Sequence, residues 1–366
     1  MKKYLVVGAR THVEGIAPGN ASGWSIWTFE DDQESVKMKT LSTIEECSPT
    51  FLVVSRDKRT VYSCNERNDD PTKGLSVFKV HDWATGLAQK VDTYDTTGTS
   101  ACYMGIVGDN LLLANYMSGS FCVFKLGADG SVLKRSFHQQ FTYHSNAQPD
   151  RQEGPHAHCA DYHAISGQLL VADLGADRLY KFDFDVDNGV CVENTEQPHV
   201  QLTAGSGPRH VALHPGGKWV YLSCELSREV VQLAFDGKKL QPVGQPVSTV
   251  LGDVPALHTA HPQTVSHVAC SDDAKWLFVA NRGAKSSIAS YSIDATTGAL
   301  SHVGNFATST TVPRYFTVHG SLMLVAMQEG DTIDCFRVNH TDGTLKLIHS
   351  EPTPTPQFIE VVTFDG

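Results

Sequence analysis

The sequence predicts an all-β chain that folds into a single seven-bladed β-propeller domain spanning residues 1–366, with a four-stranded antiparallel sheet in each blade. One observation is a repeat of apolar runs and turns that recurs at intervals of roughly 50 residues, the length of such a blade. A second is that the last repeat stops after one strand, while the chain begins without a first strand. Because the two incomplete ends complement each other, we expect the N- and C-terminal strands to share one blade and close the ring.

Each repeat opens with a short apolar run headed by a proline or a small residue. A turn such as Pro215–Lys218 then leads into a second apolar run, here Trp219–Leu222. Two more short strands complete the repeat, which is the pattern of a four-stranded meander. The openings begin at Pro49, Ala101, Pro155, Pro208, Val265, Pro313 and Pro356.

The two ends of the chain supply the seventh blade. Tyr4–Ala9 is predicted as its second strand, Trp24–Phe29 as its third and Val36–Leu41 as its fourth, with the first strand starting at Pro356. A pair of open β-sandwiches is the alternative, but it does not explain why the C-terminal fragment is a first strand. Membership of the WD40 class is disfavoured, because no repeated Gly-His and Trp-Asp pairs occur.

Composition narrows the class of partner. The chain has 29 Lys and Arg against 40 Asp and Glu, a formal net charge of −11, which argues against nucleic acid or an anionic membrane as a partner. No run approaches the roughly 20 apolar residues of a membrane span, and Tyr4–Ala9 is too short for a signal-peptide core. Nine scattered cysteines without a CxxC pair indicate free thiols. We therefore expect a cytoplasmic protein, as a monomer or weak homo-oligomer.

The repeat also predicts where functional side chains gather. In a propeller, the starts of the first strands and the ends of the second strands meet at one mouth of the central channel. The second residues of the seven openings are Thr50, Cys102, His156, Arg209, Ser266, Arg314 and Gln357. The residues that close the second strands are Arg10, Glu66, Tyr116, Leu174, Glu225, Arg282 and Gln328.

These two columns place one imidazole, four arginines and two glutamates at a single rim. A positive excess there, in an acidic chain, indicates an anionic small-molecule ligand. The alternative is that the charges pair with one another and solvate a water-filled channel. His156 and His158 could together hold a metal ion, but two ligands are too few and the arginines would repel a cation, so we expect no metal. We interpret His210, His214 and His267 as turn or packing residues.

The chain resembles the seven-bladed propeller lactonases, a family that includes propeller-type 6-phosphogluconolactonases and carboxy-cis,cis-muconate cyclases. The segments that carry the resemblance are Ser48–Phe51, Asn65-Glu66, Ala114–Tyr116, Gly154–His158, Gly207–His210 with His214-Pro215, Ala280–Gly283 and Pro313–Phe316. Cys224, Ser266 and Met327 depart from the residues that are usual in the family. The resemblance spans essentially the whole chain and implies lactone chemistry without a cofactor.

The resemblance also implies roles for residues. It assigns the catalytic positions to His156, Arg209, Glu225 and Arg282. We expect the substrate to contact Arg314, His158, Glu66, Arg10, Tyr116 and Gln328. His156 would take a proton from water, and the arginines would hold the substrate anion and the oxyanion. The leading hypothesis is hydrolysis of an anionic sugar lactone, with 6-phosphogluconolactone as first candidate. A muconate-type lactonising cyclase and a non-catalytic interaction propeller are the alternatives.

Overall fold

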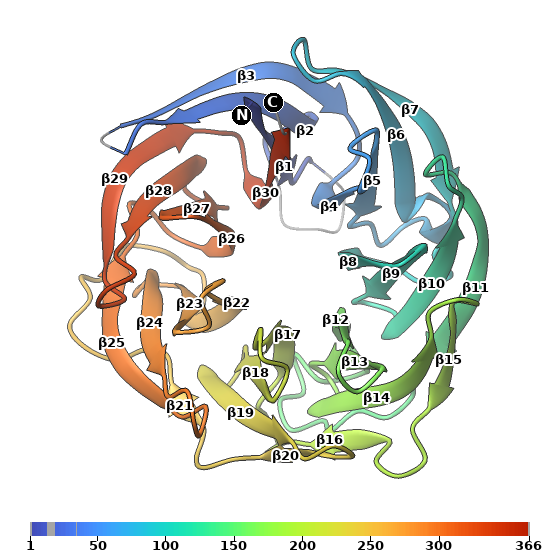
Figure 1. Ribbon diagram of the computed structural model, residues 1–366, viewed down its shortest axis with the longest axis vertical. Helices are drawn as coiled ribbons and strands as arrows, with labels where there is room; N and C mark the ends of the chain where they lie inside the picture. The colour runs from blue at the N-terminus through green and yellow to red at the C-terminus, as the bar shows by residue number, and fades with distance from the viewer. Residues whose placement is uncertain (1, 13–18, 34, 365–366) are drawn as a thin grey trace.

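The computed structural model describes residues 2–12, 19–33 and 35–364, so part of the predicted 1–366 domain lies outside it. Seven antiparallel sheets stand around a central axis (Figure 1). Within the described residues the only helical element is the short 3₁₀ turn η1 (Pro71–Lys73). None of the helices found there is long or apolar enough to cross a bilayer. The predicted all-β, seven-bladed propeller is confirmed.

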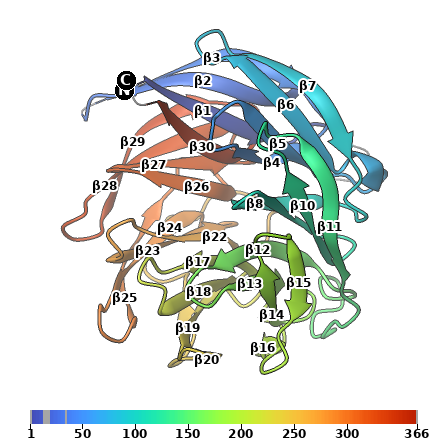
Figure 2. The same cartoon turned by 45° about the vertical axis from the view of Figure 1, so that its right-hand side comes forward.

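The strands follow the chain blade by blade, except that the C-terminal strand β30 joins the blade of the first three strands (Figures 1 and 2). The blade shared by the two ends holds β1 (Lys2–Ala9), β2 (Gly23–Asp31), β3 (Val36–Glu45) and β30 (Pro356–Phe364). The next two blades hold β4 (Pro49–Val54), β5 (Thr60–Asn65), β6 (Leu75–Asp82), β7 (Leu87–Tyr94), β8 (Ala101–Val107), β9 (Asn110–Asn115), β10 (Ser120–Leu126) and β11 (Val132–Gln140).

The third and fourth blades each split their outer strand into two short pieces. They hold β12 (Ala157–His163), β13 (Gln168–Asp173), β14 (Arg178–Asp185), β15 (Val190–Glu193), β16 (His199–Gln201), β17 (Pro208–Leu213), β18 (Trp219–Cys224), β19 (Glu229–Phe235), β20 (Leu240–Pro242) and β21 (Val247–Ser248). The last two hold β22 (Thr264–Cys270), β23 (Trp276–Arg282), β24 (Ser287–Ile293), β25 (Leu300–Ala307), β26 (Pro313–His319), β27 (Leu322–Met327), β28 (Thr332–Val338) and β29 (Leu345–Pro352).

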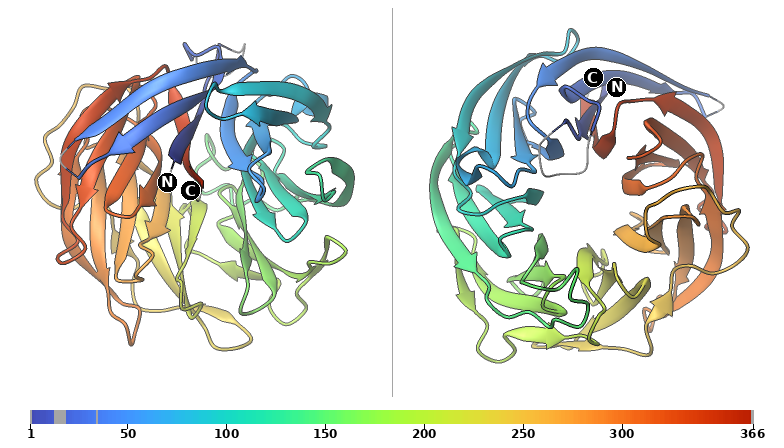
Figure 3. Two further views of the ribbon diagram at one scale, coloured as in Figure 1. Left: turned by 45° about the horizontal axis from the view of Figure 1, so that its top comes forward. Right: turned by 180° about the vertical axis from the view of Figure 1, so that it is seen from behind.

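The two ends of the chain close the ring as predicted. Strand β30 pairs antiparallel with β1, with Phe358 opposite Gly8 and Val362 opposite Tyr4. The sheet order is β3-β2-β1-β30, so the C-terminal strand lies innermost. Figures 1 and 3 show the blue and red strands side by side. Strand β1 is therefore flanked by β2 and β30, and the sheet that the two ends share closes the ring.

Burial differs from strand to strand within a blade. Every residue of the second strands β5, β9, β13, β18, β23 and β27 is buried. These strands pack against neighbouring blades on both faces, so their sequences are continuous apolar runs rather than alternating ones. The outer strand β7 is mostly exposed, and it alternates polar and apolar residues only weakly. This gradient explains why the second strands are the clearest repeat in the sequence.

Every first strand has a β-bulge near its start. At each bulge the ladder register shifts by one extra residue, and bulges commonly re-aim a side chain. The extra residues are Thr50, Cys102, His158, Arg209, Ser266 with His267, Arg314 and Gln357. This series differs from the predicted column at one position, because the third blade presents His158 where the sequence pattern indicated His156.

Backbone hydrogen bonds confirm this register. The N–H of the residue that follows a second strand donates to the carbonyl two residues before the bulge. Glu225 donates to Gly207 at 2.7 Å, Gln328 to Val312 at 2.9 Å, and Leu174 to His156 at 2.9 Å. His156 therefore occupies the place of Gly207, two positions ahead of the Arg209 column.

Just beyond the bulges, the first strands carry a belt of rings that contact one another. The belt consists of Phe51, Tyr103, His210, His267, Tyr315 and Phe358. Neighbouring centroids are 4.1 to 5.1 Å apart around the full circle, from His267–Tyr315 to His210–His267 and Tyr103–His210. The first strands therefore pack ring against ring at this level. His210 and His267 pack in this belt, as predicted for them.

Glu360 lies on the other side of this belt, on β30, and gives a test of the buried channel. Its carboxylate accepts a hydrogen bond from Val54 N at 3.3 Å, and burial raises its pKa to about 7 from 4.5. Between these two values the folded state holds a proton that the unfolded state has lost, so stability falls as pH rises. We expect Glu360→Gln to raise the unfolding free energy at pH 8 by about 1–2 kcal/mol. Urea unfolding at pH 4.5 and pH 8 measures this, and an equal effect at both values would contradict it.

Candidate active site

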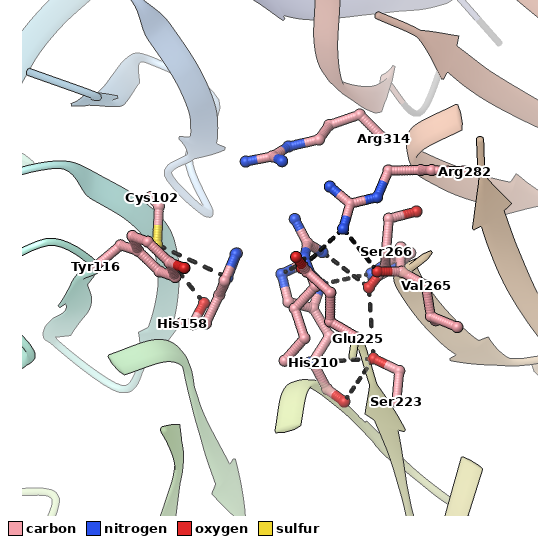
Figure 4. A network of polar contacts seen from close by, with 12 residues as sticks. Cys102, Tyr116, His158, His210, Ser223, Glu225, Val265, Ser266, Arg282 and Arg314 are labelled. Atoms are coloured by element: carbon pink, nitrogen blue, oxygen red, sulfur yellow. Dashed lines mark hydrogen bonds and ion pairs between the residues drawn. The ribbon is translucent and has the colours of Figure 1, made fainter. Parts of the chain in front are cut away.

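A cavity of about 300 Å³ opens at the mouth where the bulge residues lie. Its wall consists of Arg10, Glu66, Cys102, Tyr116, Arg151, His158, Glu225, His261, Pro262, Arg282 and Arg314. Seven of the ten residues that the sequence singled out are among them. Figure 4 shows Cys102, Tyr116 and His158 on one side of the space, facing Glu225, Arg282 and Arg314.

Glu225 follows β18 and holds three guanidinium groups. One carboxylate oxygen lies 2.6 Å from Arg151 Nη2, and the other lies 2.7 Å from Arg282 Nη2 and 3.0 Å from Arg209 Nε. The side chains of Glu225, Arg209 and Arg282 are 5%, 2% and 4% exposed. A carboxylate with so little water around it stays charged only because its partners compensate for desolvation.

The pKa of Glu225 shows this balance. Burial acts to raise the pKa of Glu225, but Arg282, Arg151 and Arg209 together hold it well below its usual range. Burial and the charges of Arg314 and Arg282 lower the pKa of Arg209, and Glu225 opposes that shift. The three arginines therefore depend on one carboxylate, that of Glu225, to compensate their charge.

Glu66 forms a second, smaller centre across the cavity. Its carboxylate is 2.8 Å from Arg10 Nη2 and 3.9 Å from Arg314 Nη2. Burial acts to raise the pKa of Glu66, but Arg10 and Arg314 hold it below its usual value. Five arginines thus share two carboxylates. The wall has a positive excess although the whole chain has a net charge of −11.

The arginines also leave donors unused. Within the described part of the chain, the buried Nε atoms of Arg10 and Arg282 have no hydrogen-bond acceptor. Buried donors without acceptors are costly, because the lost hydration is not replaced. The site therefore has more donors than its own residues satisfy.

His158 is the imidazole at the cavity wall. Its Nδ1 lies 3.8 Å from Cys102 Sγ, and its ring lies edge-on to Tyr116 at 5.3 Å. Burial and the charges of Arg209 and Arg314 hold the pKa of His158 well below 6.5, so the ring is neutral at neutral pH. Burial raises the pKa of Cys102 to about 12, so its thiol is also neutral.

His156 does not line the cavity. Its Nδ1 faces the Tyr116 carbonyl oxygen at 3.0 Å and its Nε2 faces the Glu153 carboxylate at 3.1 Å. The ring stacks on Tyr116 at 4.5 Å. Both ring nitrogens therefore face acceptors. His156 contacts the cavity wall only through the ring and backbone of Tyr116. Gln328, which was predicted to contact the substrate, is half-buried and does not line the cavity.

Arg209 reaches the site from behind. Its Nη1 donates to the Ser266 carbonyl at 2.8 Å and lies 3.1 Å from His210 Nε2. Because arginine only donates, His210 Nε2 is the acceptor, and His210 Nδ1 then donates to His267 Nδ1 at 2.8 Å. This chain fixes the tautomers of both histidines and orients Arg209 towards Glu225.

Besides His158, three wall residues lie outside the predicted columns. Arg151 comes from the connection between β11 and β12, and His261 and Pro262 come from the connection between β21 and β22. Neither connection shares the blade repeat, so the columns could not identify them. Their lengths are the one available signal, since long loops are frequently functional. Among the described residues no group of three or more His, Cys, Asp or Glu side chains forms a metal site.

Comparison with known proteins points to one family. The family model described as Lactonase, 7-bladed beta-propeller, matches residues 4–362. A 6-phosphogluconolactonase of Bacillus subtilis is 27% identical over 361 residues, covering 96% of this chain and 95% of that protein. A crystal structure from Bacteroides fragilis superposes with a TM-score of 0.87 at 29% identity, covering 99% and 98% of the two chains. The periplasmic gluconolactonase of Pseudomonas aeruginosa has a TM-score of 0.87 at 25% identity over 99% of each chain.

Proposed function

The chain belongs to the seven-bladed β-propeller lactonase family, and from that premise we propose that it hydrolyses an anionic sugar lactone, with 6-phosphogluconolactone as the leading candidate. The observation that supports an anionic substrate most directly is the excess of four arginines over two glutamates in the wall of one cavity. A volume of about 300 Å³ suits a single small molecule. The activity of the Bacillus subtilis relative supports the choice of lactone.

We assign the proton transfer to His158. Water adds to the lactone carbonyl carbon as His158 takes one of its protons, and the ring oxygen then leaves and receives that proton. The product is a hydroxy acid, and no cofactor enters the balance. A neutral imidazole is the form that accepts a proton. The oxyanion that develops beside it offsets the arginine charges, so the basicity of His158 increases as the reaction proceeds.

We assign charge stabilisation to Arg282 and Arg314. Both line the cavity, and Figure 4 shows their guanidinium groups directed into it. Fixed donors at a developing oxyanion need no reorganisation during the reaction, which is why they lower the barrier effectively. Glu225 acts on this step as a positioning residue because it holds Arg282 from within the wall, and Arg209 acts from behind the wall by pairing with Glu225.

The test of the proposal is a pH-stat screen of the purified protein. Its arms are 6-phosphogluconolactone, gluconolactone and carboxymuconolactone, each corrected for spontaneous opening. We expect the phosphorylated lactone to give the highest kcat/KM. Activity only on carboxymuconolactone would redirect the assignment to muconate chemistry, and no rate above the blank on any lactone would overturn it.

The pH dependence of the same reaction tests the role of His158. Since its pKa lies well below 6.5, the base is deprotonated throughout the neutral range, and activity is lost only as pH falls through the lowered pKa. We expect the acid limb of kcat/KM to lie below pH 6.5. A limb at or above this value would exclude His158 in this environment as the base.

We also propose a cytoplasmic location. All nine cysteines are free, and seven of them are buried, which suits a reducing compartment. The Pseudomonas aeruginosa relative is periplasmic, so fractionation of cells that express the protein decides between the two compartments.

A further inference from the structure

Two connections between blades are much longer than the others, and both reach the cavity. Residues 141–156 link β11 to β12, and residues 249–263 link β21 to β22, whereas the other connections between blades are short turns. The first supplies Arg151 and the second supplies His261 and Pro262. Residues on long loops beside a regular repeat are suited to selecting the ligand, because they can differ without disturbing the scaffold.

The segment around Arg151 is held firmly in place. The neighbouring Gln152 is fully buried and its side chain donates to the Leu174 carbonyl at 2.8 Å and to Asp177 Oδ1 at 2.9 Å. A Cβ atom at Gly175 would lie 1.8 Å from the Gly154 carbonyl oxygen, so only glycine lets the loop approach the third blade this closely. Arg151 is therefore presented from an anchored backbone.

Arg151 is the most accessible arginine of the Glu225 network. Its side chain is 36% exposed, against 2% for Arg209 and 4% for Arg282. Burial acts to lower the pKa of Arg151, but Glu225 raises it above its usual value. If Arg151 turned towards a ligand, Glu225 would still be paired with Arg209 and Arg282. Of the three partners, Arg151 can therefore exchange the carboxylate for an incoming anion at the lowest cost.

Tyr116 connects Arg151 to the proposed reaction centre. Its ring is 5.3 Å from the His158 ring, and its hydroxyl oxygen accepts a hydrogen bond from Arg151 Nη2 at 3.3 Å. A ligand whose carbonyl lies at His158 and whose far end reaches Arg151 would extend along Tyr116. An exocyclic phosphate on a sugar lactone is such a far end.

We propose that Arg151 is the residue that selects phosphorylated over neutral lactones, by binding the phosphate monoester with its guanidinium group. The inference rests on the proposed lactonase function. It adds to that function the residue that binds the anionic group of the substrate. A guanidinium group binds phosphate through paired, charge-assisted hydrogen bonds, which a neutral lactone cannot form.

The experiment compares Arg151→Gln and Arg151→Lys with wild type on 6-phosphogluconolactone and on gluconolactone. For Arg151→Gln we expect kcat/KM on the phosphorylated lactone to fall by about 30-fold, mainly through KM, and on gluconolactone by less than about threefold. Arg151→Lys should recover part of the loss, since lysine keeps the positive charge but lacks the paired donors of the guanidinium group. Arg135→Gln, an exposed arginine on β11 that does not line the cavity, controls for the change in net charge.

The outcomes separate this inference from the one it rests on. Equal losses on both lactones, or no loss on either, would overturn the role of Arg151 while leaving lactonase activity in place. If wild type hydrolyses neither lactone, the proposed function fails. Titration calorimetry with 6-phosphogluconate then decides on Arg151 alone. We expect Kd to rise about tenfold or more in Arg151→Gln, and an unchanged Kd or no binding to wild type would overturn the inference.

Discussion

Glu225→Gln is expected to lower kcat/KM by about 10³-fold and the free energy of unfolding by about 3–5 kcal/mol. The substitution keeps the shape of the side chain but removes the only negative charge that Arg151, Arg209 and Arg282 share. Two of these guanidinium groups are almost fully buried, so they would repel each other without compensation. Steady-state kinetics and urea unfolding followed by tryptophan fluorescence measure the two effects.

A matched control is Glu193→Gln, on the outer strand β15, where the side chain is exposed. It makes the same chemical change on the surface, and surface charges contribute about 0–1 kcal/mol. If Glu225→Gln proved as stable and as active as this control, Glu225 would not be the centre that holds the arginines together.

His158→Asn is expected to reduce kcat by about 10²- to 10⁴-fold with a smaller change in KM, because it removes the imidazole that faces the cavity. His156→Asn is the matched comparison, two residues away on the same segment. Its ring acts only through the stacked Tyr116, so we expect a reduction of less than about tenfold. Both variants should be measured on 6-phosphogluconolactone with the spontaneous rate subtracted.

The order of the two effects decides between the assignments. A larger loss for His156→Asn than for His158→Asn would restore the catalytic role that the sequence pattern and the family resemblance gave to His156. It would also mean that the cavity wall changes when substrate binds, since both nitrogens of His156 now face acceptors.

The fold could be predicted from the sequence because its strongest signals are local. The buried second strands are continuous apolar runs, and glycine- and aspartate-rich turns separate them from the first strands. Ring closure followed from a count of strands at the two ends, and β30 paired with β1 confirms it. Most of the wall followed as well, since Glu66, Glu225 and Arg282 close second strands at corresponding places.

The histidine register could not be predicted from the sequence, for a reason that lies in the bulge. Pro155 resembles Pro208 and Pro313, which head the first strands β17 and β26. In the third blade, however, the strand begins at Ala157, and the bulge falls on His158. A bulge is set by the local ladder rather than by a fixed sequence signature, so two histidines two residues apart could not be told apart.

Arg151 and His261 escaped prediction because they lie outside the repeat. Loops between blades have no periodicity, and the two predicted columns contain only residues at the ends of strands. The packing of Gln152 against Leu174 and Asp177 depends on contacts between distant segments, which a single sequence does not display.

The most direct test of the arginine-rich cavity is a crystal structure of the protein with 6-phosphogluconate bound. We predict that the sugar acid occupies the cavity, with its phosphate at Arg151 and its carboxylate near His158 and Arg314. Electron density for the ligand elsewhere on the molecule, in crystals of protein shown to hydrolyse the lactone, would contradict the placement of the active site.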